Sequence, residues 1–235
     1  MKINRIHPIR PAPAEFIAIQ ERLGKQTDTS LAVRIQDIST VAGVDLAYAG
    51  ADGEETGFCH IAVLDMQTMQ VIERAESVGR IEVPYAPGFL TFRELPLILE
   101  AAEKLKSEPD LFIFDGNGIL HPRRMGIATH TSFFLGKPTI GVAKTYFKVA
   151  NAEYDMPDIE KGSYTDIVVD GETLGRAVRT SAGVKPVFVS PGNQINLASA
   201  TDIALHLTGP GSRIPIPVRE ADIQTRKMRR RWAAR

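Results

Sequence analysis

The feature that most constrains the fold is a strand, helix, strand pattern in the middle of the chain. A continuous apolar run at 110–115 predicts a buried strand, and a second run at 138–144 predicts another. Between them we expect a helix with His121 near its cap, Pro122 in its first turn and Gly136 after its last turn. In a right-handed crossover of this kind the two strands run parallel, which places the chain in the α/β class.

This pattern also brings together two charged residues. Asp115 ends the first apolar run and Lys144 ends the second, so both emerge at the same edge of the sheet. The N-terminus of the intervening helix, which attracts anions, faces the same edge. We therefore expect a crevice that contains a carboxylate, an ammonium group and an anion-binding helix end.

The segments before this unit predict an antiparallel meander that follows an N-terminal helix. The helix is expected at 13–24, and three β-rich segments follow it at 40–50, 57–66 and 70–83. The third of these is charged enough to be an edge strand.

A further helix and a hairpin complete the predicted elements. Helical spacing of apolar residues covers 88–106, but Pro96 predicts an irregular first turn near Glu94. After the parallel strands, residues 164–180 predict a hairpin that turns at Asp170 and Gly171.

Asp45 stands inside the first β-rich segment, where a carboxylate is costly to bury. Val41, Gly43 and Ala47 share its face of the strand, and none of them is polar. One interpretation is an ion pair with an arginine. The other is a divalent metal held by Asp45, Asp115 and Glu94, for which oxygen ligands favour Mg²⁺.

Composition restricts the class of protein without defining its function. The 235 residues carry a net charge of zero, and one cysteine excludes an internal disulfide. No apolar run is long enough for a membrane span, and the N-terminus does not resemble a signal peptide, so a cytoplasmic location is expected.

Six of the last ten residues, 226–235, are Lys or Arg. This tail is either a phosphate-binding appendage or a solvated end that contacts nothing.

Seven motifs, in order, resemble the endonuclease V family of DNA repair nucleases. The likeness extends from about Thr40 to about Thr225 and is specific because the motifs occur together. They are "GVDLAY", "VPYAPGFLTFRELP", "FDGNGILHPRRMGIATH", "GKPTIGVAKTYF", "GRAVRT", "KPVFVSPGNQI" and "PIPVREAD". The resemblance implies one catalytic domain over 1–235 with a ribonuclease H-like fold, in which a central mixed sheet of three antiparallel and then parallel strands is flanked by helices.

The resemblance also implies a reaction. Members of the family use Mg²⁺, with Mn²⁺ as a substitute, to hydrolyse the second phosphodiester bond 3′ to deoxyinosine, and they leave a 3′-hydroxyl and a 5′-phosphate. By this likeness Asp45, Glu94 and Asp115 bind the metal, and Lys144 neutralises charge on the phosphorane. His121 matches a motif position whose role is either catalytic or limited to capping a helix through hydrogen bonds.

The chain departs from the family pattern near its C-terminus. Some members carry a histidine near the position of Asp222 in the "READ" motif. If this acid points into the site, it could hold a metal-bound water; otherwise it is a helix residue paired with a nearby arginine.

The loop "PYAPGF" indicates how a damaged base is found. Tyr85 stands between Pro84 and Pro87, which stiffen the loop and lower the entropy lost when the ring enters a base stack. Gly88 follows in the same loop. The resemblance implies that this loop is a strand-separating wedge that binds DNA.

Two glycines after Asp115 suit a pocket for a rotated base. Gly116 and Gly118 have no side chain, so their backbone can approach the base and its phosphate. An ordinary tight turn is the alternative interpretation. The expected partner is DNA that contains deoxyinosine or another deaminated base, bound by a monomer with no membrane association.

Two other functions remain compatible with the sequence. A ribonuclease H-like nuclease that acts mainly on inosine-containing RNA would use the same catalytic residues. A non-catalytic nucleic-acid binding module would explain the basic tail and the wedge, but three convergent carboxylates would repel phosphate without a metal.

Overall fold

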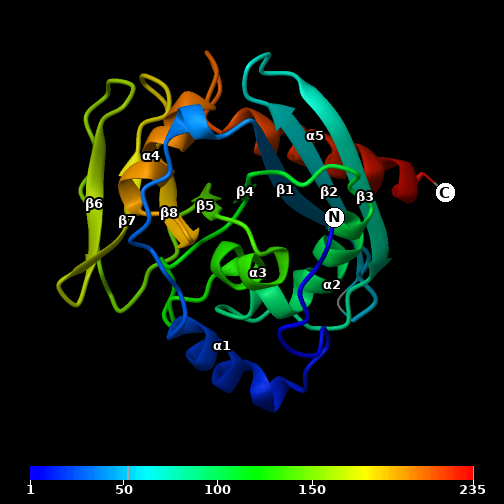
Figure 1. The fold of residues 1–235 in the computed structure, drawn as a ribbon. Coiled ribbons are helices and arrows are strands. Elements are labelled where there is room, and N and C mark those ends of the chain that lie inside the picture. The colour runs from blue at the N-terminus through cyan, green and yellow to red at the C-terminus, as the bar shows by residue number, and fades with distance from the viewer. Residues whose placement is uncertain (52, 235) are drawn as a thin grey trace.

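The computed structural model describes residues 1–51 and 53–234 and is built on one mixed β-sheet (Figure 1). Within these residues, eight strands pair in the order β3-β2-β1-β4-β5-β8-β7-β6. The strands are β1 (Thr40–Ala49), β2 (Thr56–Asp65), β3 (Val71–Arg80), β4 (Leu111–Phe114), β5 (Thr139–Ala143), β6 (Tyr164–Val169), β7 (Glu172–Val178) and β8 (Val187–Asn193).

The directions of the strands confirm the predicted topology. Strands β1, β2 and β3 form an antiparallel meander with β3 at the edge, and β4 and β5 follow β1 in parallel. Strand β8 returns antiparallel to β5, and the hairpin of β6 and β7 extends the sheet from there. The hairpin turns at Asp170 and Gly171, both with positive φ, as the sequence predicts.

Helices cover both faces of the sheet. They are α1 (Phe16–Gly24), α2 (Leu90–Glu103), α3 (Ile127–Leu135), α4 (Leu197–His206) and α5 (Ile216–Ala233). Helices α2 and α3 share one apolar core with the sheet, and α4 and α5 share a second core on the opposite face. No helix in the described ranges is long and apolar enough to cross a membrane.

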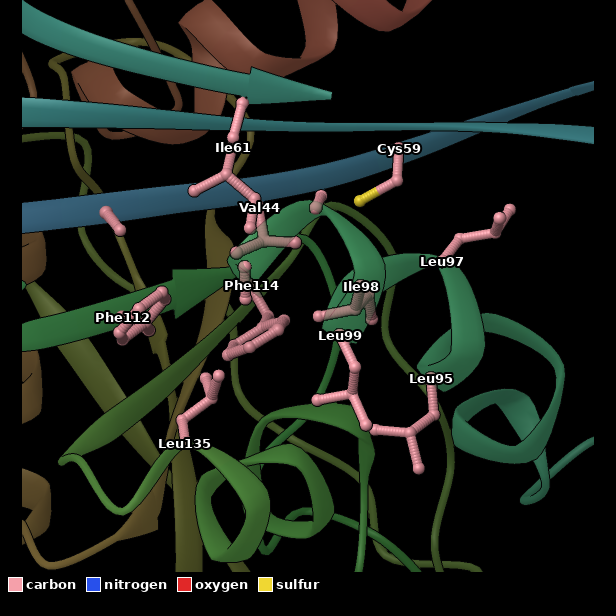
Figure 2. Close-up of a cluster of buried hydrophobic side chains, with 14 of the residues drawn as sticks. Val44, Cys59, Ile61, Leu95, Leu97, Ile98, Leu99, Phe112, Phe114 and Leu135 are labelled. Carbon is pink, nitrogen blue, oxygen red and sulfur yellow. The ribbon is translucent and has the colours of Figure 1, made fainter. Parts of the chain in front are cut away.

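The core under α2 and α3 follows from strand alternation (Figure 2). Val44, Ile61 and Phe114 point from three neighbouring strands toward this face. Ile98 from α2 and Leu135 from α3 close the layer. Each such side chain contributes roughly 1.5–3 kcal/mol when it is fully buried, so this layer holds β1 and β4 firmly at the centre of the sheet.

On the opposite face, Gly43 lets α5 lie directly on β1. A Cβ atom at Gly43 would overlap the backbone of Pro217 in the first turn of α5. Gly43 and Asp45 share one face of β1, since side chains alternate along a strand. The close approach at Gly43 therefore brings the following turns of α5 over Asp45.

Two expectations about helices are wrong. Helix α3 begins at Ile127 rather than near His121, because residues 119–126 form turns and Arg124 has a φ of 54°, outside the helical region. Helix α2 is continuous from Leu90 through Pro96 to Glu103, so the proline does not shorten or interrupt it. Packing of α2 on the sheet offsets the loss of one backbone hydrogen bond at this proline.

The basic tail is part of α5 up to Ala233, and its basic side chains at 226–231 are exposed, as in a solvated end. The tail is nevertheless not free of contacts. The ring of Trp232 lies 6.1 Å from the ring of Phe58 on β2, in an edge-on arrangement. The end of α5 is thereby fixed against the sheet.

Candidate active site

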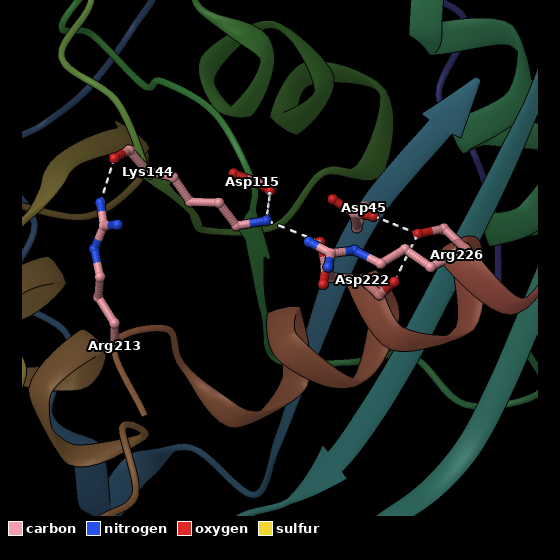
Figure 3. Close-up of polar contacts among 7 residues, drawn as sticks. Asp45, Asp115, Lys144, Arg213, Asp222 and Arg226 are labelled. Atoms are coloured by element: carbon pink, nitrogen blue, oxygen red, sulfur yellow. Dashed lines mark hydrogen bonds and ion pairs between the residues drawn. The ribbon is translucent and has the colours of Figure 1, made fainter. Parts of the chain in front are cut away.

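Three carboxylates meet where β1, β4 and α5 come together (Figure 3). Val44 and Phe114 are partners in the parallel pair of β1 and β4, so the next residues, Asp45 and Asp115, lie side by side. Helix α5 supplies Asp222. One oxygen atom from each of the three side chains lies within 4.8 Å of the other two. We call Asp45, Asp115 and Asp222 the acidic cluster.

Lys144 joins the acidic cluster from the end of β5. Its Nζ lies 2.6 Å from Asp115 Oδ2 and 2.9 Å from Asp222 Oδ1. The expectation that Asp115 and Lys144 share one edge of the sheet is confirmed. Partial burial alone would lower the pKa of Lys144, but Asp115 and Asp222 outweigh it and hold the pKa above its ordinary value.

Asp45 is buried, and its pKa is raised to about 7. Burial is the main cause and repulsion from Asp115 adds to it, whereas a hydrogen bond from the Thr225 hydroxyl at 2.6 Å opposes it. Among residues 1–51 and 53–234 no arginine forms an ion pair with Asp45, so the arginine interpretation is wrong. The carboxylate instead faces other acids, an arrangement that a bound cation would relieve.

Glu94 lies on α2, outside the set of oxygens that approach within 4.8 Å. It is buried and accepts a hydrogen bond from the Tyr48 hydroxyl. Burial raises the pKa of Glu94 to about 8, and the charges of Asp45 and Asp115 act in the same direction. Glu94 therefore interacts with the acidic cluster through electrostatic repulsion, from the α2 side of the sheet.

Asp222 is the member of the acidic cluster that sequence reasoning left open. It points into the site and also pairs with Arg226, whose guanidinium lies 3.0 Å from Asp222 Oδ1. Thr225 lies one helical turn after Asp222 and donates a hydrogen bond to Asp45, so this side of α5 faces β1. Placing Asp222 in the site requires knowing that α5 crosses β1 at Gly43.

The donor set fits a divalent cation. Asp45, Asp115 and Asp222 offer only oxygen ligands, and Lys144 offsets only part of their negative charge. Hard cations such as Mg²⁺ prefer oxygen ligands of this kind. The three aspartates are therefore the residues that could hold a metal.

A pocket of about 100 Å³ opens beside the acidic cluster, between the loop that carries Tyr85 and the start of α3. Gly116, His121 and Phe147 are among its lining residues. Tyr85 stands at its rim with 66 % of its surface exposed. The ring of Tyr85 is therefore accessible to a ligand at the mouth of this pocket.

His121 lines this pocket without capping a helix. Its Nδ1 accepts hydrogen bonds from the backbone N–H groups of Arg123 and Met125, at 3.2 and 3.3 Å, and its Nε2 donates to the carbonyl of Gly88 at 3.0 Å. Burial lowers its pKa to about 4, and the charge of Arg123 contributes. The neutral ring therefore ties the loop of Tyr85 to the floor of the pocket.

The two glycines after Asp115 differ in their surroundings. Gly116 lines the pocket beside Tyr85. Gly118 is buried against β8, where a Cβ would overlap the carbonyl of Pro191 and its own N–H donates to Ser190 Oγ at 2.8 Å. The absence of a side chain at Gly118 therefore lets this loop pack closely against the sheet.

The fold and the site together define a class of protein. A mixed sheet with carboxylates on neighbouring parallel strands, and a further acid from the C-terminal helix, is the architecture of a ribonuclease H-like nuclease.

Comparison with known proteins identifies the family within this class. The family model described as Endonuclease V matches residues 21–223. Endonuclease V of Bacillus velezensis is 52% identical over 230 residues, which is 97% of this chain and 97% of the relative, and that of Bacillus subtilis shows the same identity and coverage. The chain belongs to the endonuclease V family and is an endonuclease.

Solved structures agree with this assignment. The crystal structure of endonuclease V from Bacillus subtilis has a TM-score of 0.96 at 51% identity and covers 100% of this chain and 99% of that one. Endonuclease V of Ciona intestinalis, solved in complex with a 24mer DNA that contains an inosine followed by a ribo-adenosine, has a TM-score of 0.78 at 28% identity, with coverage of 93% and 98%.

Proposed function

We propose that the protein is a DNA repair endonuclease that hydrolyses the second phosphodiester bond 3′ to deoxyinosine, using Mg²⁺, and leaves a 3′-hydroxyl and a 5′-phosphate. The observation that carries the proposal is the acidic cluster beside a small pocket with an exposed tyrosine at its rim. The inosine-containing DNA bound by the Ciona relative supports the choice of substrate.

Asp45, Asp115 and Asp222 would hold the metal, with Glu94 acting from the α2 side. A bound Mg²⁺ would polarise the scissile phosphate and lower the pKa of an attacking water. The chain's own contribution is to keep these carboxylates fixed: Thr225 orients Asp45, and Lys144 orients Asp115 and Asp222. Rigid placement lowers the reorganisation needed at the transition state.

Lys144 supplies positive charge at the place where negative charge develops. Attack on a phosphodiester concentrates charge on the phosphoryl oxygens, and a preorganised ammonium group stabilises that charge. The raised pKa of Lys144 keeps it protonated at neutral pH. When phosphate enters, Lys144 can donate to it while remaining within reach of Asp115.

The loop and the pocket select the damaged base. Tyr85 would fill the gap left by the extruded base, and the base would enter the pocket lined by Gly116 and His121. His121 holds the loop through Gly88, so wedge and pocket keep a constant separation. We propose that the protein acts as a monomer, in which pocket, wedge and carboxylates are supplied by one chain.

Paired DNA and RNA oligonucleotides with a single inosine test the proposal. We expect nicking of the DNA in Mg²⁺ or Mn²⁺, and no nicking with a chelator or without the inosine. Faster cleavage of the RNA at matched concentration would favour the RNA nuclease. Binding without cleavage of either strand in Mg²⁺ would contradict the proposed reaction.

A further inference from the structure

The C-terminal part of α5 carries a row of basic side chains that begins at the active site. Residues at i, i+4, i+7 and i+8 share one side of an α-helix. Counted from Asp222, these positions are Arg226, Arg229 and Arg230, which we call the basic stripe. Lys227 and Arg231 lie on a different side of the same helix, since each residue advances about 100°.

The basic stripe is exposed and largely free to bind a ligand. All three side chains belong to exposed residues. Arg226 pairs with Asp222 at 3.0 Å, whereas neither Arg229 nor Arg230 has an acidic partner within 4.0 Å among residues 1–51 and 53–234. Unpaired guanidinium groups in a row attract a polyanion.

The stripe is also held in place. Trp232 packs edge-on against Phe58 of β2, and the early turns of α5 lie on β1 at Gly43. Figure 1 shows the red end of α5 continuing past β1 and β2. Because the helix is anchored on both sides of the stripe, ordering it costs little entropy when it binds.

The acidic cluster lies between the basic stripe and the pocket beside Tyr85. Leu90 and Ile127, from α2 and α3, line the pocket on one side of the sheet, whereas α5 packs on the opposite face. If the inosine occupies the pocket and the cleaved bond lies 3′ to it at the acidic cluster, the strand continues 3′ toward α5.

We propose that the basic stripe binds phosphates of the DNA duplex on the 3′ side of the nick. The inference rests on the proposed function for its direction along the strand. From Asp222 to Arg230 the helix rises about 12 Å at 1.5 Å per residue, which spans about three to four phosphates of one strand at 3.4 Å each. The stripe thereby offsets the repulsion between DNA and the acidic cluster and keeps the nicked end bound.

The test compares two double variants that remove the same charge. Arg229→Gln with Arg230→Gln alters the stripe, and Lys227→Gln with Arg231→Gln is the matched control on another side of α5. Affinity is measured in Ca²⁺ over a range of salt concentrations, for inosine duplexes with a long 3′ flank and with a 3′ flank of about three base pairs.

We expect the stripe variant to lower the slope of log affinity against log salt by about 1.8, or 0.9 for each lost phosphate contact. The loss should occur on the long 3′ flank and disappear on the short one, and the control variant should change the slope by less than half as much. Arg229→Lys with Arg230→Lys should restore the slope, which separates charge from misfolding, and the melting temperature checks each variant.

Equal slopes for the stripe and control variants would overturn the proposal in favour of diffuse attraction. A loss that persists on the short 3′ flank and depends on the 5′ flank would overturn its direction. Failure of the proposed function gives a different result, because the wild-type protein would then not nick inosine DNA. The difference in salt slope between the stripe and control variants on undamaged duplex would still measure binding of DNA by the stripe.

Discussion

At the scale of single residues, the central ion pairs link Lys144 to two members of the acidic cluster. Lys144 Nζ lies within 3 Å of both Asp115 and Asp222. Lys144→Ala should raise the barrier of the single-turnover reaction by about 2–4 kcal/mol, the usual range for one preorganised electrostatic group. Rapid-quench kinetics at saturating enzyme measure this rate. A normal rate with weaker DNA binding would instead make Lys144 an ordinary phosphate contact.

Tyr85 allows a second prediction at this scale, because its ring is exposed at the rim of the pocket. Tyr85→Ala should weaken binding of an inosine duplex by about 1–3 kcal/mol, the range for stacking of a base on an aromatic ring. Tyr85→Phe should retain most of the affinity. The loss should be smaller on single-stranded inosine DNA, and equal losses on both substrates would make Tyr85 a general stacking platform.

The sequence predicted which strand residues meet at one edge of the sheet and left open the contribution of Asp222 from a distant helix. Asp115 and Lys144 could be placed together because parallel strands end at one edge of a sheet. Asp222 could not be placed, since its position depends on how α5 docks on β1. That docking brings Thr225 of α5 into contact with Asp45, which lies 180 residues earlier in the sequence. His121 was assigned to the wrong local structure, because its hydrogen bonds run to backbone groups of a turn.

At the scale of elements, the contact between α5 and β1 at Gly43 positions the acidic cluster. Gly43→Ala would force the added methyl group into the backbone of Pro217. We expect this variant to lose about 1–3 kcal/mol of stability, the typical cost of overpacking, and to lose nicking as Asp222 moves away from Asp45.

Gly209→Ala is the matched control for this prediction. A Cβ at Gly209 would meet only the Ile216 side chain, at 3.9 Å, which is an ordinary contact. Its melting temperature and nicking rate should match the wild type. If Gly43→Ala behaves like Gly209→Ala in both measurements, docking of α5 does not position the cluster.

Elements with strong local patterns were predicted well, and those that depend on long-range packing were not. The meander, the parallel pair and the hairpin followed from apolar runs and turn residues, and the structure confirms them. The start of α3 was misplaced because Pro122 is compatible with a helix start, whereas contacts of residues 119–126 with β8 and the loop of Gly88 fold them into turns. The effect of Pro96 on α2 was overestimated for the same reason, since packing of α2 on the sheet outweighs the loss of one backbone hydrogen bond at the proline.

At the scale of the whole molecule, the raised pKa values of Asp45 and Glu94 couple stability to pH. In the metal-free protein both carboxyl groups bind a proton more tightly in the folded state than in the unfolded state. The resulting stabilisation is fully present at pH values below the ordinary pKa values of 3.8 and 4.5, and it is lost as the pH rises through about 7 and about 8. With a chelator present, we expect the melting temperature to fall from about pH 5 to about pH 8.

Asp45→Asn should flatten this dependence, because it removes one of the two titrating groups. Mg²⁺ added to the wild type near pH 8 should raise the melting temperature, since a ligand that binds the folded state stabilises it. Identical pH profiles for the wild type and Asp45→Asn would show that Asp45 does not carry the coupling.

The most direct test of the central claim is single-turnover cleavage of a 5′-labelled duplex that contains one deoxyinosine. In Mg²⁺, the wild type should give one product that ends in a 3′-hydroxyl at the second phosphodiester bond 3′ to the lesion. Asp115→Asn should keep most of its affinity for the duplex in Ca²⁺ and lose about a hundredfold or more in rate. Cleavage by Asp115→Asn at the wild-type rate, or a wild-type product that ends elsewhere, would contradict the assignment of the acidic cluster to this reaction.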